Sequence, residues 1–247
     1  MAIRQTWRSW IGGVFVVLSL CAGHAQAAPI SQLEAQYLNR GNGMIYDPTR
    51  NLTWISDMNF AFTSNYTAPG VGSDGRMNWS AAVKFADELV YGGFSDWRLP
   101  MLNLNDPTCD DQFTVPVYGL TTQGGGCTGG ELSGLFGTGL GNRPNQSVLN
   151  QVGDTPDQIA NYALFTNVAP ALYWSGTARP EAGIGNRVWL YSTHWGTVWS
   201  DRQAEIYRVL LVRTGDVAVV PEPSTSALLA AGLAGLLVVG RRRRADA

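Results

Sequence analysis

The sequence predicts an α+β fold in which short antiparallel strands flank one main helix. Three observations favour it. An amphipathic pattern runs through residues 78–90, β-prone segments lie before and after it at 44–55 and 171–213, and no internal repeat or second core is visible. Because strands precede and follow the helix, the first and last of them can pair. We therefore expect a single domain at residues 28–220 of the 247-residue chain, with processing signals at both ends.

The main helix is predicted from apolar residues at spacings of three and four: Trp79, Ala82, Val83, Ala86, Leu89 and Val90. Lys84, Asp87 and Glu88 fall on the opposite face. Asn78 suits the N-cap, because its side chain can accept a bond from a free amide of the first turn. Gly92 can adopt the left-handed conformation that ends many helices, so we expect the helix to end there.

Short strands are expected on both sides of the helix. Residues 44–47 and 52–55 surround a polar turn that contains a proline, after a loose lead-in at 28–42. The last third of the chain predicts strands at residues 171–175, 187–192, 196–200 and 206–213. Trp195-Gly196-Thr197 supplies the tight turn of an antiparallel hairpin. Residues 57–78 predict a loop, and residues 101–171 a long irregular region with a short helix at 131–140.

The N-terminus has the pattern of a secretory signal peptide at residues 1–27. Arg4 and Arg8 precede an apolar run at 11–23, and Ala25-Gln26-Ala27 offers the small residues that signal peptidase reads. The run is too short to span a bilayer comfortably. Cys21 leaves a lipoprotein alternative open, although the residue before it is a leucine where a lipobox has a small residue.

The C-terminus carries three features in a fixed order. Pro221, Glu222 and Pro223 precede an uncharged stretch at residues 226–240, which predicts a short transmembrane segment, and Arg241–Arg244 follow it. This order resembles the PEP-CTERM sorting signal at residues 221–247. The resemblance implies an exosortase-type sorting enzyme as partner, membrane contact only before processing, and export through the inner membrane to the cell surface or extracellular matrix. A permanent membrane anchor is the alternative that apolarity leaves open.

The charge balance of the mature body excludes one class of partner. Residues 28–220 hold 11 basic and 17 acidic residues, a formal charge of −6, and Lys84 is their single lysine. Nucleic-acid binding needs clustered cations that displace counterions from phosphates. We therefore expect no nucleic-acid partner.

Cys109 and Cys127 are the two cysteines that remain after removal of the signal peptide. In an exported protein such a pair predicts a disulfide, which here would tether the long irregular region. A zinc site is the alternative interpretation. It has too few ligands, because a structural zinc site needs four nitrogen or sulfur ligands and the mature body holds these two cysteines and one histidine, His194.

Five motifs carry a family resemblance. Gly-Gly-Phe-Ser followed by Asp-Trp-Arg-Leu-Pro at residues 92–100 is accompanied by four further motifs, at 51–57, 74–79, 173–177 and 212–216. Together they resemble the Lcl C-terminal domain family, that of collagen-like adhesins, over most of residues 44–217. The resemblance implies a C-type-lectin-like fold and surface binding, with no reaction common to the family's members.

The sequence lacks the residues that several classes of enzyme and cofactor site require. A glycine-rich stretch at 124–129 matches a dinucleotide motif but neither follows a predicted strand nor opens a convincing helix, and no Gly-x-Ser-x-Gly motif occurs. The fold implied by the resemblance is also similar to that of formylglycine-generating enzymes, whose paired-cysteine motif is missing. We expect no cofactor, with calcium on Asp106, Asp110 and Asp111 as the alternative.

The function predicted is that of an exported, non-enzymatic binding module for extracellular carbohydrate. Of the mature tryptophans, Trp195 and Trp199 lie at the predicted hairpin and are the candidate ligand contacts, whereas the motif residues Trp54, Trp79, Trp97 and Trp174 are expected in the core. The contact surface would comprise the 101–171 region and the 193–199 hairpin. Two alternatives stay open: both hairpin tryptophans pack inside, or the protein is a hydrolase that acts on extracellular polysaccharide through two carboxylates.

Overall fold

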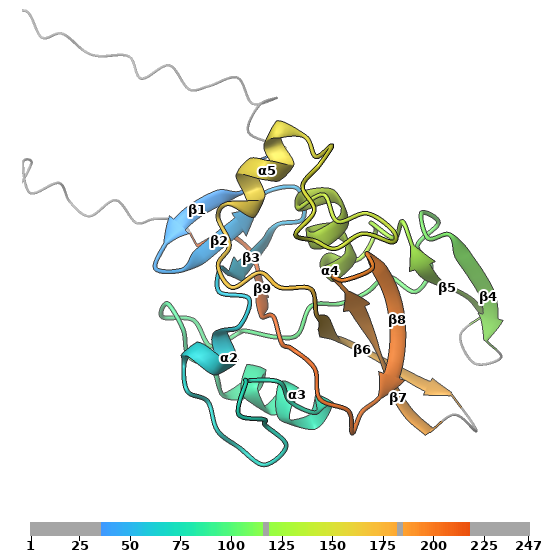
Figure 1. Ribbon diagram of the computed structural model, residues 1–247. Helices are drawn as coiled ribbons and strands as arrows, with labels where there is room; N and C mark the ends of the chain where they lie inside the picture. Colours follow the sequence, from blue (N-terminus) through green and yellow to red (C-terminus); the bar gives the residue numbers. More distant parts are fainter. Residues whose placement is uncertain (1–35, 116–118, 182–184, 218–247) are drawn as a thin grey trace, which may run out of the picture.

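The computed structural model describes residues 36–115, 119–181 and 185–217, which form a mixed α and β structure with two antiparallel sheets (Figure 1). The first sheet has the strand order β1-β2-β3-β9, with β1 at Leu38–Gly41, β2 at Met44–Asp47, β3 at Leu52–Ile55 and β9 at Val212–Thr214. The strands predicted at 44–47 and 52–55 are confirmed, and β3 pairs with β9 as expected. The prediction of a loose lead-in at 28–42 is wrong for its last residues. Asn42 and its two neighbouring glycines adopt positive φ angles and turn the chain into a β1–β2 hairpin.

The second sheet has the strand order β4-β5-β8-β7-β6. Its strands are β4 at Asp111–Val115, β5 at Gly119–Gly125, β6 at Leu172–Glu181, β7 at Gly185–Ser192 and β8 at Thr197–Arg202. The β7–β8 hairpin and three of the four late strands are confirmed in place. The strand expected at 206–213 is mostly wrong, since only its end forms β9 and the residues before it make isolated bridges through Tyr207 and Arg208.

The five-stranded sheet separates two hydrophobic clusters. Alternate side chains of β6, β7 and β8 enter one cluster on each side: Tyr173, Trp189, Tyr191 and Val198 on the first, and Trp174, Val188 and Leu190 on the second. Phe136 stacks on Tyr191 on the first side, with ring centroids 5.3 Å apart. Trp54, Trp97 and Trp174 are buried as expected, whereas Trp79 is only partly buried.

The main helix, α3, runs from Trp79 to Glu88. Its predicted N-cap is confirmed, because the Asn78 side chain accepts a hydrogen bond from the amide of Ala81 at 3.0 Å. The predicted end is wrong: the chain becomes extended at Leu89, and Gly92 lies in a later tight turn between Tyr91 and Phe94. The buried face consists of Ala81, Ala82, Phe85 and Ala86, so it is rotated from the face that the spacing predicted.

The region at 101–171 is more ordered than expected. It contains β4, β5, a helical segment and α5 at Pro156–Tyr162. The helix expected at 131–140 is confirmed as α4 at Glu131–Ser133, which continues into the π-helix η1 at Gly134–Gly139. The predicted 57–78 loop holds a further short helix, α2, at Phe60–Thr63.

None of the helices in the described residues is long and apolar enough to cross a membrane. The predicted signal peptide at 1–27, the Pro-Glu-Pro motif, the apolar segment at 226–240 and the arginine tail all lie outside the described residues.

Candidate ligand-binding surface

Trp195 and Trp199 lie on the surface of the β7–β8 hairpin. Their side chains are 54% and 53% exposed, whereas Trp174 and Trp189 in the same sheet are almost fully buried. Trp199 points outward because its strand neighbours Val198 and Ser200 point inward. We call the exposed side of Trp195, Trp199 and the pocket beside them the tryptophan surface.

The backbone that carries Trp195 is held by the loops on either side of it. Its carbonyl accepts a hydrogen bond from the amide of Asn145 at 2.7 Å, and its amide donates to the Ser192 hydroxyl at 3.3 Å. Two residues before Trp195, the Thr193 amide donates to the carbonyl of Ala171 at 2.8 Å. The indole is therefore exposed on a backbone that is fixed before any ligand arrives, which lowers the entropy lost on binding.

Gly196 completes the turn that positions the two tryptophans. Its φ angle is +61°, a conformation that L side chains rarely adopt. A Cβ atom at this position would also overlap the backbone carbonyl of Arg143. A glycine is therefore required here for two independent reasons.

An open pocket of about 510 Å³ lies beside the two indoles. Its volume falls in the range of small-molecule sites. It is lined by Pro170, Ala171, Leu172, Ser192, His194, Trp195, Thr197 and Trp199. His194 is exposed and sets its ring edge-on to Trp195, with centroids 4.4 Å apart. The pocket thus combines apolar ring faces with a few hydroxyl and imidazole groups at its edge.

The pocket includes only a small part of the contact surface that the sequence predicts, and it adds one residue that the sequence did not predict. Of the region at 101–171, only Pro170 and Ala171 line it. Leu172 was expected to be a strand residue and was not predicted to be part of a site. Because it pairs with Ser192 on the same face as Trp199, the sheet register brings it to the pocket, and a register is not readable from sequence spacing alone.

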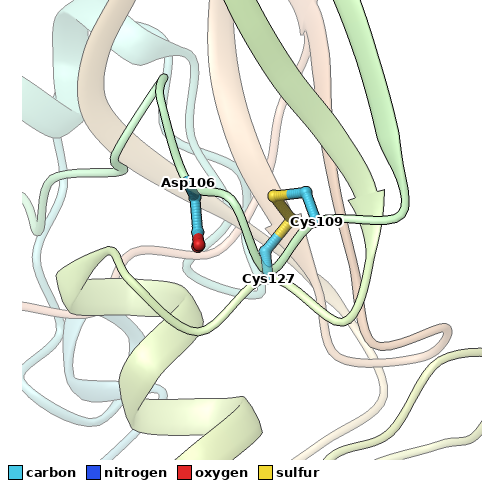
Figure 2. Close-up of side chains that lie close together, drawn as sticks. All are labelled: Asp106, Cys109 and Cys127. Atoms are coloured by element: carbon cyan, nitrogen blue, oxygen red, sulfur yellow. A yellow bond between two sulfur atoms is a disulfide. The ribbon is translucent and has the colours of Figure 1, made fainter.

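The predicted disulfide between Cys109 and Cys127 is present (Figure 2). Asp106 lies beside it, and one carboxylate oxygen of Asp106 and the two cysteine Sγ atoms all lie within 4.8 Å of one another. Both sulfur atoms are bonded to each other, so they are not available as metal ligands. The group therefore joins β4, β5 and α4 covalently and by hydrogen bonds.

Both carboxylate oxygens of Asp106 are engaged by hydrogen bonds. Its Oδ1 atom accepts hydrogen bonds from the Thr108 amide and hydroxyl, and its Oδ2 atom accepts from the amides of Thr128 and Gly129. Burial alone would raise the pKa of Asp106, but these hydrogen bonds hold the pKa below its ordinary value. Asp110 and Asp111 bind the Gly125 amide and the Gln123 side chain instead. The three carboxylates stabilise the loop rather than converge on an ion.

The glycine-rich stretch at 124–129 binds carboxylates of its own chain. Its amides at Gly125, Thr128 and Gly129 donate to Asp110 and Asp106. A dinucleotide loop would direct such amides at a phosphate. The stretch is therefore a structural loop of this domain.

Comparison with known proteins gives one match. Residues 219–244 match the PEP-CTERM protein-sorting motif, which includes Pro221, Glu222 and Pro223. No curated protein and no solved structure matches the chain significantly. PEP-CTERM motifs are recognised by exosortases and imply export across the inner membrane. The chain is therefore an exported protein that is sorted to the cell surface or extracellular space.

Proposed function

We propose that residues 28–220 form a non-enzymatic module that binds extracellular polysaccharide through the tryptophan surface. The observation that carries this proposal is the pair of half-exposed indoles of Trp195 and Trp199 on a backbone held by hydrogen bonds. Sugar rings present a face of C–H groups that packs on an indole, while their hydroxyls remain free for polar partners. Here Thr197 and His194 line the pocket and offer such partners.

The exposure of the two indoles needs an explanation in an exported protein. Tryptophan is enriched at binding surfaces because it supplies a large rigid contact area with little loss of side-chain entropy. Leaving two such rings in water forgoes the stabilisation that burial would bring. A ligand that covers them in the extracellular space recovers it.

The C-type-lectin-like fold of the Lcl C-terminal resemblance is part of this proposal. Its support is that the motif segments meet in space. Arg98 and Val212 exchange backbone hydrogen bonds of 2.9 and 3.0 Å, which joins the motif at 92–100 to the motif at 212–216. The Trp79 indole donates to the Ser175 carbonyl at 2.9 Å, which joins two further motifs. The motifs therefore form one structural unit.

The hydrolase alternative finds less support. A glycosidase needs two carboxyl groups at a fixed separation across the scissile bond. No aspartate or glutamate is among the residues that line the pocket beside the tryptophans. We therefore propose binding at this surface and keep turnover as an outcome of the test.

The test is a screen of purified residues 28–220 against polysaccharides isolated from the extracellular matrix, with and without calcium. The matched variant is Trp195→Ala/Trp199→Ala, whose melting temperature should equal that of the parent. We expect saturable binding by the parent and its loss in the variant. Equal binding by both proteins, or release of sugar from the polysaccharide, would overturn the proposal.

A further inference from the structure

The tryptophan surface offers polar groups to a ligand but no fixed charge. Among the described residues, no aspartate, glutamate, lysine or arginine lines its pocket. The polar side chains that line it are Ser192, Thr197 and His194. The Ser192 hydroxyl accepts a hydrogen bond from the Trp195 amide, whereas the Thr197 hydroxyl and the His194 ring reach no hydrogen-bond partner in the described part of the chain. Those two groups therefore remain available to a ligand.

Asp201 is the charged residue that follows Trp199 most closely on β8, two positions later and on the same face of the sheet. Its Oδ2 atom accepts a hydrogen bond from the Tyr207 hydroxyl at 2.7 Å. Its Oδ1 atom lies 3.7 Å from a guanidinium nitrogen of Arg187. The charge of Asp201 is therefore balanced by an arginine, and Asp201 does not line the pocket.

Two arginines close to the pocket in the fold are likewise engaged elsewhere. Arg143, whose carbonyl lies against the hairpin turn, forms an ion pair with Asp154. Arg208 forms a bridge with Tyr173 beside the start of β6, and it lies next to the Tyr173 hydroxyl. Successive strand residues point to opposite faces of a sheet, so this arginine is on the other face from Leu172, which lines the pocket. A bound carboxylate or sulfate would find no counter-charge in either of them.

The two indoles favour a particular kind of sugar ring. Trp195 and Trp199 are each about half exposed. A pyranose whose hydroxyls are all equatorial has only C–H groups on its two faces and carries its hydroxyls around its edge. Such a ring can lie on an indole while its edge hydroxyls reach Thr197 and His194. An axial hydroxyl would point into the indole and lose its water without gaining a partner, which lowers affinity.

We propose that the tryptophan surface binds an uncharged polysaccharide of equatorial hexopyranoses, the class of β-linked glucans to which cellulose belongs, and discriminates against anionic polysaccharides. The inference rests on the proposed function and names the class of its ligand. A carboxylate that leaves water for a pocket without a counter-charge loses its hydration unrepaid. The mature body, with a formal charge of −6, also repels a polyanion from a distance. Because no ion pair forms, added salt should leave the affinity for the uncharged polymer unchanged.

The experiment compares two polymers with the same backbone: hydroxyethylcellulose, which is uncharged, and carboxymethylcellulose, which carries carboxylates. The mature protein from the native envelope or medium is titrated with each by calorimetry at about pH 8, above the usual titration range of histidine. Sodium chloride is set to about 50 mM and then about 500 mM, which shortens the range of charge interactions. We expect saturable binding of hydroxyethylcellulose with equal affinity at both salt concentrations, and at least tenfold weaker binding of carboxymethylcellulose at low salt.

A second pair of ligands tests the shape of the ring. Cellohexaose and mannohexaose are both uncharged and differ in the orientation of one hydroxyl, which is axial in mannose. We expect mannohexaose to bind about tenfold more weakly, because its axial hydroxyl loses water against an indole. Trp195→Ala/Trp199→Ala should lose cellohexaose binding at an unchanged melting temperature. Phe62→Ala, which removes a half-exposed aromatic ring outside the pocket, is the matched control and should bind like the parent.

The outcomes separate this inference from the proposed function. The inference is overturned if carboxymethylcellulose binds as tightly as hydroxyethylcellulose, if salt weakens binding of the uncharged polymer tenfold, if mannohexaose binds like cellohexaose, or if no cellulose ligand binds. Tryptophan-dependent binding of an anionic polysaccharide would overturn the inference and still support the proposed function. Equal binding of hydroxyethylcellulose by the parent and the tryptophan variant would overturn both.

Discussion

Arg98 and Glu131 form a two-bond ion pair that joins the motif at 92–100 to the start of α4. The two guanidinium nitrogens of Arg98 donate to the two carboxylate oxygens at 2.6 and 2.7 Å. Glu131 also accepts the amide of Met101 at 2.8 Å. The sequence leaves open whether Asp96 and Arg98, which flank Trp97, pair with each other or with the backbone. In the structure Asp96 binds Arg213 at 2.8 Å instead of Arg98, and Arg98 also donates to the backbone carbonyl of Leu99 at 3.3 Å.

We predict that Arg98→Lys lowers the free energy of unfolding by about 1–2 kcal/mol, because an ammonium group cannot make both bonds at once. Urea denaturation measures it. The control is Lys84→Ala, which removes an exposed pair with Glu88 within α3 and should leave the stability nearly unchanged. Equal stability of Arg98→Lys and the parent would show that the ion pair is unimportant.

Gly196→Ala should destabilise the fold and weaken polysaccharide binding, because the new Cβ atom meets the Arg143 carbonyl in a turn with positive φ. Gly93→Ala is the matched control, since Gly93 has a φ of +85° but open space around its Cβ position. We expect Gly196→Ala to lose about 1–3 kcal/mol more than the control in chemical denaturation. A loss equal to the control's would mean that the contact with Arg143 relaxes freely.

We predict that protonation of Asp106 in acid lowers the stability of the protein. Its pKa is lower in the folded protein than in the unfolded chain, so its hydrogen bonds stabilise the fold above about pH 4 and are lost as the pH falls through the folded pKa. Asp106→Asn should lower stability at pH 7 and reduce the drop between neutral and acidic pH. Urea midpoints at pH 7 and pH 3 test this, and an unchanged drop in the variant would contradict it.

The signal-peptide pattern at the N-terminus and the sorting motif at the C-terminus together predict that the mature protein lacks both ends. Intact mass of the protein from the native envelope or medium should exclude residues 1–27 and the arginines at 241–244. Replacing Pro221, Glu222 and Pro223 by alanine should leave the arginines attached. A wild-type species that retains the arginines would contradict exosortase processing.

Short sequence patterns predicted the strands and the helix start that depend on neighbouring residues alone. The two short segments at 44–47 and 52–55, on either side of a polar turn that contains a proline, predicted β2 and β3, and Asn78 predicted the start of α3. The helix α5 was missed, although Thr155 and Gln158 form a capping box that was readable in the sequence. Strand β5 was missed because its glycines and polar residues obscure a strand pattern, and β4 was missed because it is short and begins with two polar residues.

The long-range ion pairs were not predictable from the sequence. Asp96 meets Arg213 across 117 positions, and Arg98 meets Glu131 across 33. Asp96 and Arg98 are two positions apart, and nothing in the local sequence indicated that each has a distant partner. The pocket beside α5 was missed for the same reason, because Tyr37, Arg50 and Asp157, which line it, come from separate parts of the chain. The sequence left open whether the two hairpin tryptophans are exposed or pack inside, and the structure shows that both are about half exposed.

The affinity and stability of Trp195→Ala, measured together, test the central claim most directly. We predict at least a tenfold loss of polysaccharide affinity with an unchanged melting temperature, because the indole is exposed and contacts the ligand. Trp189→Ala, at a buried position of the same sheet, should instead lose about 3–5 kcal/mol of stability. Unchanged affinity in Trp195→Ala, or a loss of stability as large as that of Trp189→Ala, would contradict the account.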